Sequence, residues 1–160
     1  TQSTLESISM NPLQRLKTLF LMVLIAGPAV GLAKAETPDV MALATLDRFM
    51  AAFNDQDIKA WAATLHYPHV RFASSQVMIY ASAANFQARS VFPALQAIGW
   101  HHSLWTSRTI TLSSDTKVHI DTEFERRNAN NETIGRYRSL YIVTKIEGHW
   151  GIQARSSLAP

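Results

Sequence analysis

The sequence predicts an α+β fold in which N-terminal helices pack against a mainly antiparallel sheet. Apolar residues first recur at helical spacing in two consecutive segments, and after Gly99 they alternate with period two, as in strands. The connections between the predicted strands are too short for the crossover that a parallel pair needs. We therefore expect one domain over residues 36–160, with an antiparallel meander as its second half.

The first predicted helix carries a single apolar stripe that can pack against a sheet. Its members are Leu43, Leu46, Phe49, Met50 and Phe53. The helix is expected to end at Asn54, and Asp57 lies in the first turn of a second helix, where the dipole favours a carboxylate. The second apolar stripe runs to Leu65, and Pro68 is expected to end that helix because the residue before proline avoids the helical region.

Short strands are expected at residues 70–72 and 76–80. Ser82 can cap a third helix, which restarts at Pro93, and Gly99 is placed to end the helical segment. The rest of the chain predicts four long strands, at about residues 101–112, 117–126, 134–146 and 149–157.

Requiring apolar residues to share one face of the sheet predicts which side chains turn towards the helices. The short turn at Glu147-Gly148 is expected to pair Ile142 with Gln153. The predicted helix-facing side chains are Leu104, Ile110, Leu112, Val118, Ile120, Phe124, Leu140 and Ile142, with His102, Arg108, Arg126, Arg138, Gln153 and Arg155 nearer the sheet ends. The predicted outer face carries Trp105, Thr109, His119, Asp121, Tyr137, Tyr141, Val143, Trp150 and Ile152. Because so many large rings would otherwise face water, we expect a homodimer to cover this outer face.

The first 35 residues have the pattern of a signal peptide. Two basic residues precede a short apolar run at residues 19–30, and Ala33-Lys34-Ala35 forms a small-residue cleavage site. The alternative is an uncleaved anchor, although the run is shorter than the roughly 20 apolar residues of a membrane helix. Residues 1–9 are expected to lie upstream of the true start, because Thr1 cannot initiate translation. These features predict a periplasmic or secreted mature domain.

Charge and cysteine content exclude several classes of function. The chain has 15 Lys and Arg against 12 Asp and Glu, and three of the basic and one of the acidic residues precede residue 36. The mature segment therefore carries a net charge of only +1, which gives no reason to expect nucleic acid or an anionic membrane surface as partner. The chain has no cysteine, so disulfides, thiolate metal sites and a cysteine nucleophile are excluded.

Three segments resemble the nuclear transport factor 2-like superfamily, and in particular its SnoaL-like branch. They are the helix junction at residues 48–57, the segment Leu65-His-Tyr-Pro-His-Val-Arg-Phe72, and the hairpin at residues 147–152. The resemblance covers residues 40–157. It implies a cone in which N-terminal helices pack in the concave face of a curved sheet, with a pocket at the open end.

The same resemblance argues against ketosteroid isomerase activity. Those enzymes have a tyrosine where this chain has Phe49, and their general-base aspartate would fall at Ala73 or Ser74. Their second aspartate would fall near Leu140 or Ile142. Since all three chemical groups are replaced, the sequence predicts a different function.

Arginines give the most specific prediction of a binding site. Arg108, Arg126 and Arg155 fall on the predicted helix-facing side, where half-buried guanidinium groups need a carboxylate or phosphate partner. The alternative is that such arginines extend to solvent at the rim, which we favour for Arg138. The full set of predicted ligand-binding residues is Trp61, His66, Arg108, Arg126, Gln153 and Arg155.

Histidines predict a candidate acid–base group rather than a metal site. His66 and His69 straddle a proline, and adjacent residues such as His101 and His102 point to opposite faces of a strand, so no metal is expected. No cofactor is expected either. His102 is the candidate catalytic residue, because it falls near a sheet end on the predicted helix-facing side. A dyad of His119 with Asp121 would lie on the outer face, where an interface hydrogen bond is the favoured role.

Three functions follow as expectations. The first is an exported domain that binds a small organic molecule, with an anion favoured, and has no assigned reaction. The second is a lyase, isomerase or hydrolase of the polyketide-cyclase or dehydratase type, in which His102 transfers protons and Arg155 holds an oxyanion. The third is a dimeric protein-interaction module.

Overall fold

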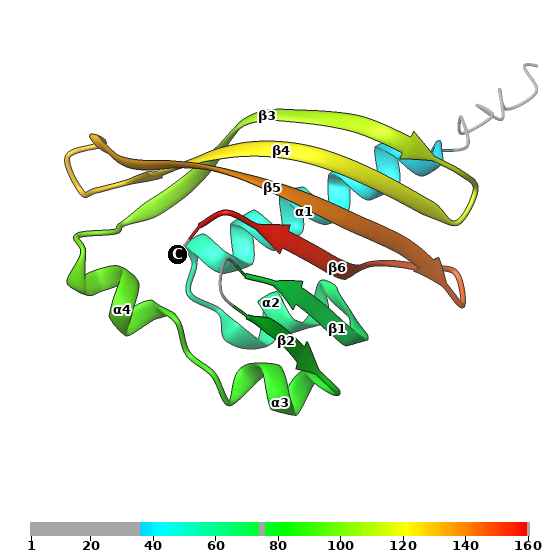
Figure 1. Ribbon diagram of the computed structural model, residues 1–160, viewed down its shortest axis with the longest axis horizontal. Coiled ribbons are helices and arrows are strands. Elements are labelled where there is room, and N and C mark those ends of the chain that lie inside the picture. The colour runs from blue at the N-terminus through cyan, green and yellow to red at the C-terminus, as the bar shows by residue number, and fades with distance from the viewer. Residues whose placement is uncertain (1–35, 74–75, 160) are drawn as a thin grey trace, which may run out of the picture. The chain divides into compact units, whose positions relative to one another are not determined.

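The computed structural model describes residues 36–73 and 76–159, which form an α+β domain as the sequence predicts. The predicted signal peptide lies outside the described residues. The helices are α1 (Pro38–Asn54), α2 (Ile58–Ala63), α3 (Ala83–Gln87) and α4 (Phe92–Ala97). The strands are β1 (Leu65–Phe72), β2 (Val77–Tyr80), β3 (His102–Ser113), β4 (Lys117–Arg127), β5 (Thr133–Ile146) and β6 (His149–Ser157) (Figure 1). Within the described ranges, no helix is both long and apolar enough to cross a membrane.

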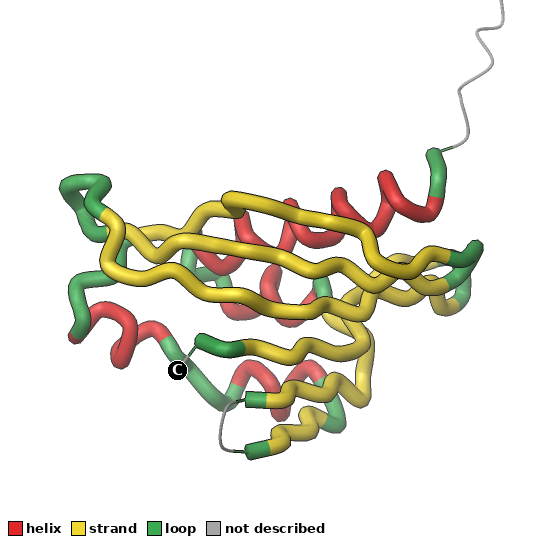
Figure 2. Tube along the Cα trace, turned by 45° about the horizontal axis from the view of Figure 1, so that its top comes forward, coloured by secondary structure: helices red, strands yellow, loops and turns green. Residues whose placement is uncertain are grey.

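The six strands form one sheet in the order β2-β1-β6-β5-β4-β3. Strands β3 to β6 make the predicted antiparallel meander, whereas β1 pairs in parallel with β6 and antiparallel with β2. Helix α1 contacts β3 to β6, α2 contacts β1, and α3 contacts β2. In Figure 2, α1 lies behind the sheet, and no helix covers the face turned to the viewer.

Local signals explain where the first two helices begin. The Thr37 hydroxyl accepts a hydrogen bond from the N–H of Val40, and Pro38 occupies the first position of α1, where no N–H is needed. The Asp57 carboxylate accepts from the N–H groups of Lys59 and Ala60 at 3.0 and 2.9 Å, which caps α2. The buried face of α1 includes most of the predicted apolar stripe.

The predicted end of the second helix is wrong. Helix α2 stops at Ala63, Leu65 begins β1, and Pro68 lies inside that strand after a cis peptide bond. The N–H of Ile152 on β6 donates to the carbonyl of Thr64 at 2.9 Å. Pairing with β6 therefore draws the chain into the sheet several residues earlier than the proline alone predicts.

Sheet faces are predicted correctly for β4 and wrongly for β5. Val118, Ile120 and Phe124 are buried under the helices as expected. On β5 the buried residues are Ser139, Tyr141 and Val143, while Leu140 is 37% exposed on the outer face. The other side chains wrongly predicted to face outwards are Trp105, Tyr137, Trp150 and Ile152, which all pack with the hydrophobic core.

Irregular pairing explains much of this error. Near the turn Val143 pairs with Ile152, but the register then shifts, so that Ile142 pairs with Ala154 rather than Gln153. The extra residue in β6 turns both Ile152 and Arg155 towards the helices. A second shift, between Trp105 and Ser107 of β3, brings Trp105 onto the helix side.

Candidate functional site

A cavity of about 290 Å³ lies between the helices and the inner face of the sheet. Its apolar wall comes from Phe49 and Phe53 of α1, Trp61 of α2 and Leu95 of α4. The ring centroid of Trp61 lies 5.5 Å from that of Phe49 and 5.0 Å from that of Phe53. This packing gives the cavity a rigid aromatic wall that suits an organic ligand.

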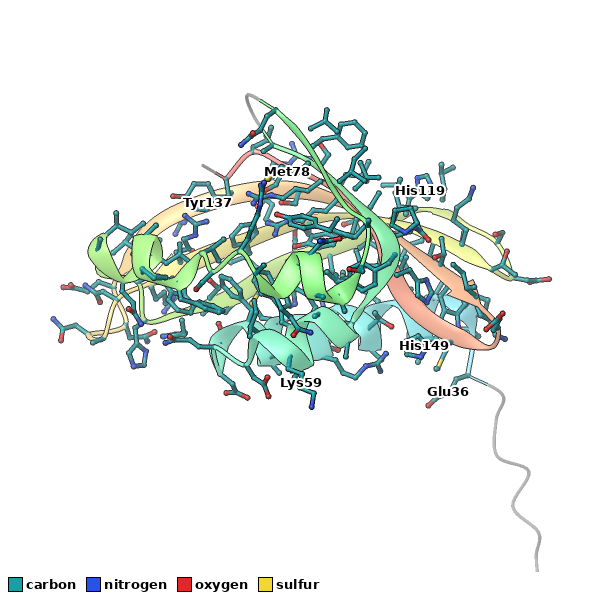
Figure 3. All side chains as sticks on the ribbon, turned by 90° about the horizontal axis from the view of Figure 1, so that it is seen from below. Glu36, Lys59, Met78, His119, Tyr137 and His149 are labelled. Carbon is teal, nitrogen blue, oxygen red and sulfur yellow. The ribbon has the colours of Figure 1, made fainter. Side chains whose placement is uncertain are left out.

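The opposite wall contains three arginines from separate strands. Arg71 of β1 and Arg155 of β6 are Cα partners in the parallel pair, and Arg155 is in turn the partner of Tyr141 on β5. Arg126 of β4 completes the set, with its guanidinium carbon 4.7 Å from the centroid of the Tyr137 ring, which Figure 3 labels. Three positive charges therefore line one side of a small aromatic cavity.

Arg155 is held in place without a carboxylate. Its Nη2 donates to the hydroxyl oxygens of Ser139 and Ser157 at 3.3 and 3.1 Å. Its guanidinium carbon lies 5.1 Å from the Tyr141 ring centroid and 5.6 Å from that of Phe124. Burial lowers the pKa of Arg155, and the neighbouring positive charges of Arg71 and Arg126 lower it further. Serine hydroxyls and ring faces orient this guanidinium but do not neutralise its charge.

Five buried N–H groups at the cavity lack a hydrogen-bond acceptor within the described part of the chain. They are Nε of Arg71, Arg126 and Arg155 and Nε1 of Trp61 and Trp105. No aspartate or glutamate is among the described residues that line the cavity. A buried donor without a partner costs about 1–3 kcal/mol, so the concentration of five donors at one cavity favours a ligand that supplies acceptors.

Three of the predicted ligand-binding residues, Trp61, Arg126 and Arg155, line this cavity. The other three lie elsewhere. Nδ1 of His66 lies 2.9 Å from the hydroxyl of Thr144, Arg108 forms an ion pair with Asp47 of α1 at 2.5 Å, and Nε2 of Gln153 donates to the carbonyl of Pro68.

The two remaining polar candidates also lie away from the cavity. His102 is on β3 beside its neighbour His101, with the two Nδ1 atoms 3.1 Å apart, and it is not among the residues that line the cavity. Arg138, predicted on the helix-facing side, is on the outer face, where it pairs with Asp121 at 2.5 Å and with Glu123 at 3.7 Å.

The residues that sequence reasoning missed are Arg71, Trp105 and Tyr141. Arg71 had a usable signal, because it alternates with Val70 and Phe72 and so shares a face with His69. Trp105 and Tyr141 were assigned to the opposite face. The pattern gave no sign of the register shift in β3 that turns Trp105 inwards, and on β5 it did not distinguish Tyr141 from Leu140 as the buried residue.

Comparisons with known proteins give a family and a fold. A family model described as NTF2-like protein (DUF6841) matches residues 38–159. A protein of unknown function with a cystatin-like fold from Nostoc punctiforme is 13% identical, with a TM-score of 0.63 over 76% of this chain and 90% of that one. An NTF2-like protein from Novosphingobium aromaticivorans is 11% identical, with a TM-score of 0.62 over 76% and 80%.

A ketosteroid isomerase-like protein from Erwinia carotovora atroseptica is also similar in structure. It is 17% identical, with a TM-score of 0.56 over 75% of this chain and 95% of that one. None of the curated proteins matches the chain in sequence. At these identities the structural likeness concerns the fold, and the residues that line the cavity must supply the argument about function.

Proposed function

The chain belongs to the NTF2-like family DUF6841, and from that premise we propose that it binds a small organic anion in the cavity between its helices and its sheet. The observation that carries this proposal is the set of five buried N–H donors without an acceptor. All five belong to side chains that line a cavity with no carboxylate among its described lining residues. An anion would supply both the missing acceptors and the missing negative charge.

The aromatic wall supports an organic anion over an inorganic one. A volume of about 290 Å³ corresponds to roughly ten water molecules at about 30 Å³ each, which is more than a phosphate needs. The arginines can hold the charged end, and Phe53, Trp61 and Leu95 can pack against an apolar body. We also propose that the protein belongs to the SnoaL-like branch of its superfamily, and the sequence resemblance supports this.

We propose in addition that the domain is a homodimer through its outer sheet face. Although the tryptophan and tyrosine rings predicted on this face pack with the hydrophobic core, two rows of other side chains cross the face. One row pairs Ile79 with Val70, Val70 with Ala154, and Ala154 with Ile142. In the second row, neighbouring strands pair in the same way through Val77, Phe72, Ser156 and Leu140. Ile79 is 68% and Phe72 is 48% exposed, so a second copy would remove these apolar residues from water.

The predicted signal peptide supports a location outside the cytoplasm. We propose that residues 36–160 act in the periplasm or after secretion. Mass measurement of the exported protein tests this, since cleavage after Ala35 would leave Glu36 as the first residue.

Native mass spectrometry of the purified mature protein tests the binding proposal. We expect a bound small molecule on the wild type, and its loss or reduction in Arg155→Met, which removes a charged donor from the cavity. Arg138→Met is the matched control, because it makes the same chemical change on the outer face. A ligand retained equally by both variants would contradict the proposed site.

A further inference from the structure

A small hollow of about 30 Å³ adjoins the cavity. The two spaces share the lining residues Phe49, Trp61, Arg71, Val91 and Arg155. The hollow is the size of about one water molecule or one hydroxyl group. Its wall also contains His69, a residue of β1 that the main cavity does not reach.

His69 is fixed in one tautomer by the backbone. Its side chain is buried, and Nδ1 lies 3.0 Å from the carbonyl oxygen of Ile152. Because a carbonyl can only accept, Nδ1 must carry the hydrogen, and in the neutral ring Nε2 keeps a lone pair. Burial lowers the pKa of His69 to about 4, and the charges of Arg155 and Arg71 lower it as well. The ring is therefore neutral at physiological pH.

Nε2 of His69 differs in kind from the unpartnered atoms of the main cavity. Those five atoms are all donors, whereas Nε2 can only accept in this tautomer. The hydrogen bond to Ile152 uses Nδ1, so the lone pair of Nε2 is the acceptor that the ring offers. A ligand that satisfies both groups must offer acceptors to the arginines and a donor to His69.

The position of the arginines limits how far apart those ligand groups can be. Arg71 and Arg155 line both the cavity and the hollow, so an acid group bound by them lies where the two spaces meet. A hydroxyl that enters the hollow must then be close to the acid group along the ligand. The apolar remainder extends the other way, towards Phe53, Leu95 and Trp105, which line only the larger space.

Building on the proposed anion binding, we propose that the ligand is a 2-hydroxy acid with an apolar body. Its carboxylate lies between Arg71 and Arg155, and its hydroxyl donates to Nε2 of His69. His69 is thus the group that selects a hydroxy acid over a plain carboxylic acid, because only a hydroxy acid has a hydroxyl that can donate a hydrogen bond to Nε2.

Calorimetric titration with two matched acids tests this assignment. The probes are mandelate and 2-phenylpropanoate, in both enantiomers, which differ only in a hydroxyl or a methyl group on the carbon next to the carboxylate. We expect at least one enantiomer of mandelate to bind about tenfold more tightly than its methyl counterpart, as one hydrogen bond would give. In His69→Asn this preference should fall to about twofold or less.

His69→Asn is the appropriate variant because its side-chain amide can still donate to the carbonyl of Ile152, while no atom of this shorter side chain reaches the position of Nε2. His69→Phe, which has an aromatic ring without nitrogen atoms, gives a second measurement if the first variant unfolds. Thermal unfolding of each variant shows whether it is folded.

The possible outcomes separate this inference from the proposed function. Equal binding of both acids to the wild type, or a tenfold preference that survives in His69→Asn, would overturn the role of His69 and leave anion binding standing. If neither acid binds, and aliphatic and aromatic carboxylates tested alongside do not bind either, the anion-binding proposal fails and this inference falls with it.

Discussion

Arg71 and Arg155 are Cα partners on the parallel strands β1 and β6, and both guanidinium groups line the same cavity. Their Nε atoms are buried without an acceptor among the described residues. Two like charges on adjacent strands destabilise a fold unless something neutralises them. We interpret this pair as a binding site maintained at a cost in stability.

The first prediction concerns that cost. Arg155→Met should raise the free energy of unfolding of the ligand-free protein by about 1 kcal/mol, because it removes a buried charge that repels Arg71 and Arg126. Chemical denaturation measures the change. Arg138→Met should leave the stability nearly unchanged, since its ion pair with Asp121 is on the surface. A large loss of stability in Arg155→Met would show that the arginine is mainly structural.

A second prediction uses the close approach of Gly151 to His66. A Cβ atom on Gly151 would lie 2.6 Å from Cδ2 of the imidazole, so Gly151→Ala must displace the ring and its contact with Thr144. We expect a loss of about 1–3 kcal/mol in the free energy of unfolding. In a double-mutant cycle, His66→Ala should remove most of the effect of Gly151→Ala. Additive effects of the two changes would argue against the contact.

The third prediction is a pH dependence of stability. The pKa of His69 is lowered to about 4 in the folded protein, against about 6.5 in the unfolded chain. Above pH 6.5 both states are neutral at this residue. Between pH 6.5 and 4 only the unfolded chain takes up the proton, so the free energy of unfolding falls, by about 3 kcal/mol at most.

His69→Asn has no titrating group at this position and should lose less stability over the same interval. Denaturation at a series of pH values compares the two proteins. His66, whose pKa is lowered by burial and by His149, contributes in the same direction in both proteins and so cancels in the comparison. Parallel pH curves for the wild type and the variant would contradict the buried neutral state of His69.

The fourth prediction concerns the outer face. Ile79→Glu should convert a dimer into a monomer, because it places a charge at the β2 end of the exposed apolar rows. Ile98→Glu, at the exposed end of α4, is the control and should leave the dimer intact. Sedimentation velocity distinguishes the two states. A wild-type protein that stays monomeric at high concentration would contradict the proposed dimer.

Regular alternation made β4 predictable, whereas the apolar pattern of β5 left its buried face undecided. Val118, Ile120 and Phe124 alternate without interruption on β4, and their burial follows directly from period two. On β5 the apolar residues alone gave no basis for choosing between Leu140 and Tyr141 as the buried residue. Tertiary contact with α1 decides it, since the Tyr141 ring packs edge-on against Phe49 at 5.6 Å.

The candidate site was predicted in part, and partly for the wrong reason. Arg155 faces the cavity as expected, but only because the register shift in β6 compensates for an incorrect pairing with Leu140. Arg71 was missed because Pro68 was taken to end a helix, which left β1 too short for its faces to be assigned. Both errors arise because β1 and β6 pair with strands that are distant in sequence, and neither residue propensity nor periodicity predicts such pairing.

Charge-dependent binding tests the central claim most directly. The measurement is calorimetric titration of the mature protein with mandelate and with mandelamide, which has nearly the same shape but no negative charge. We predict that at least one enantiomer of mandelate binds at least tenfold more tightly than the amide, and that Arg155→Met removes this difference. Equal affinity for the acid and the amide, unchanged in Arg155→Met, would contradict an anion-binding cavity.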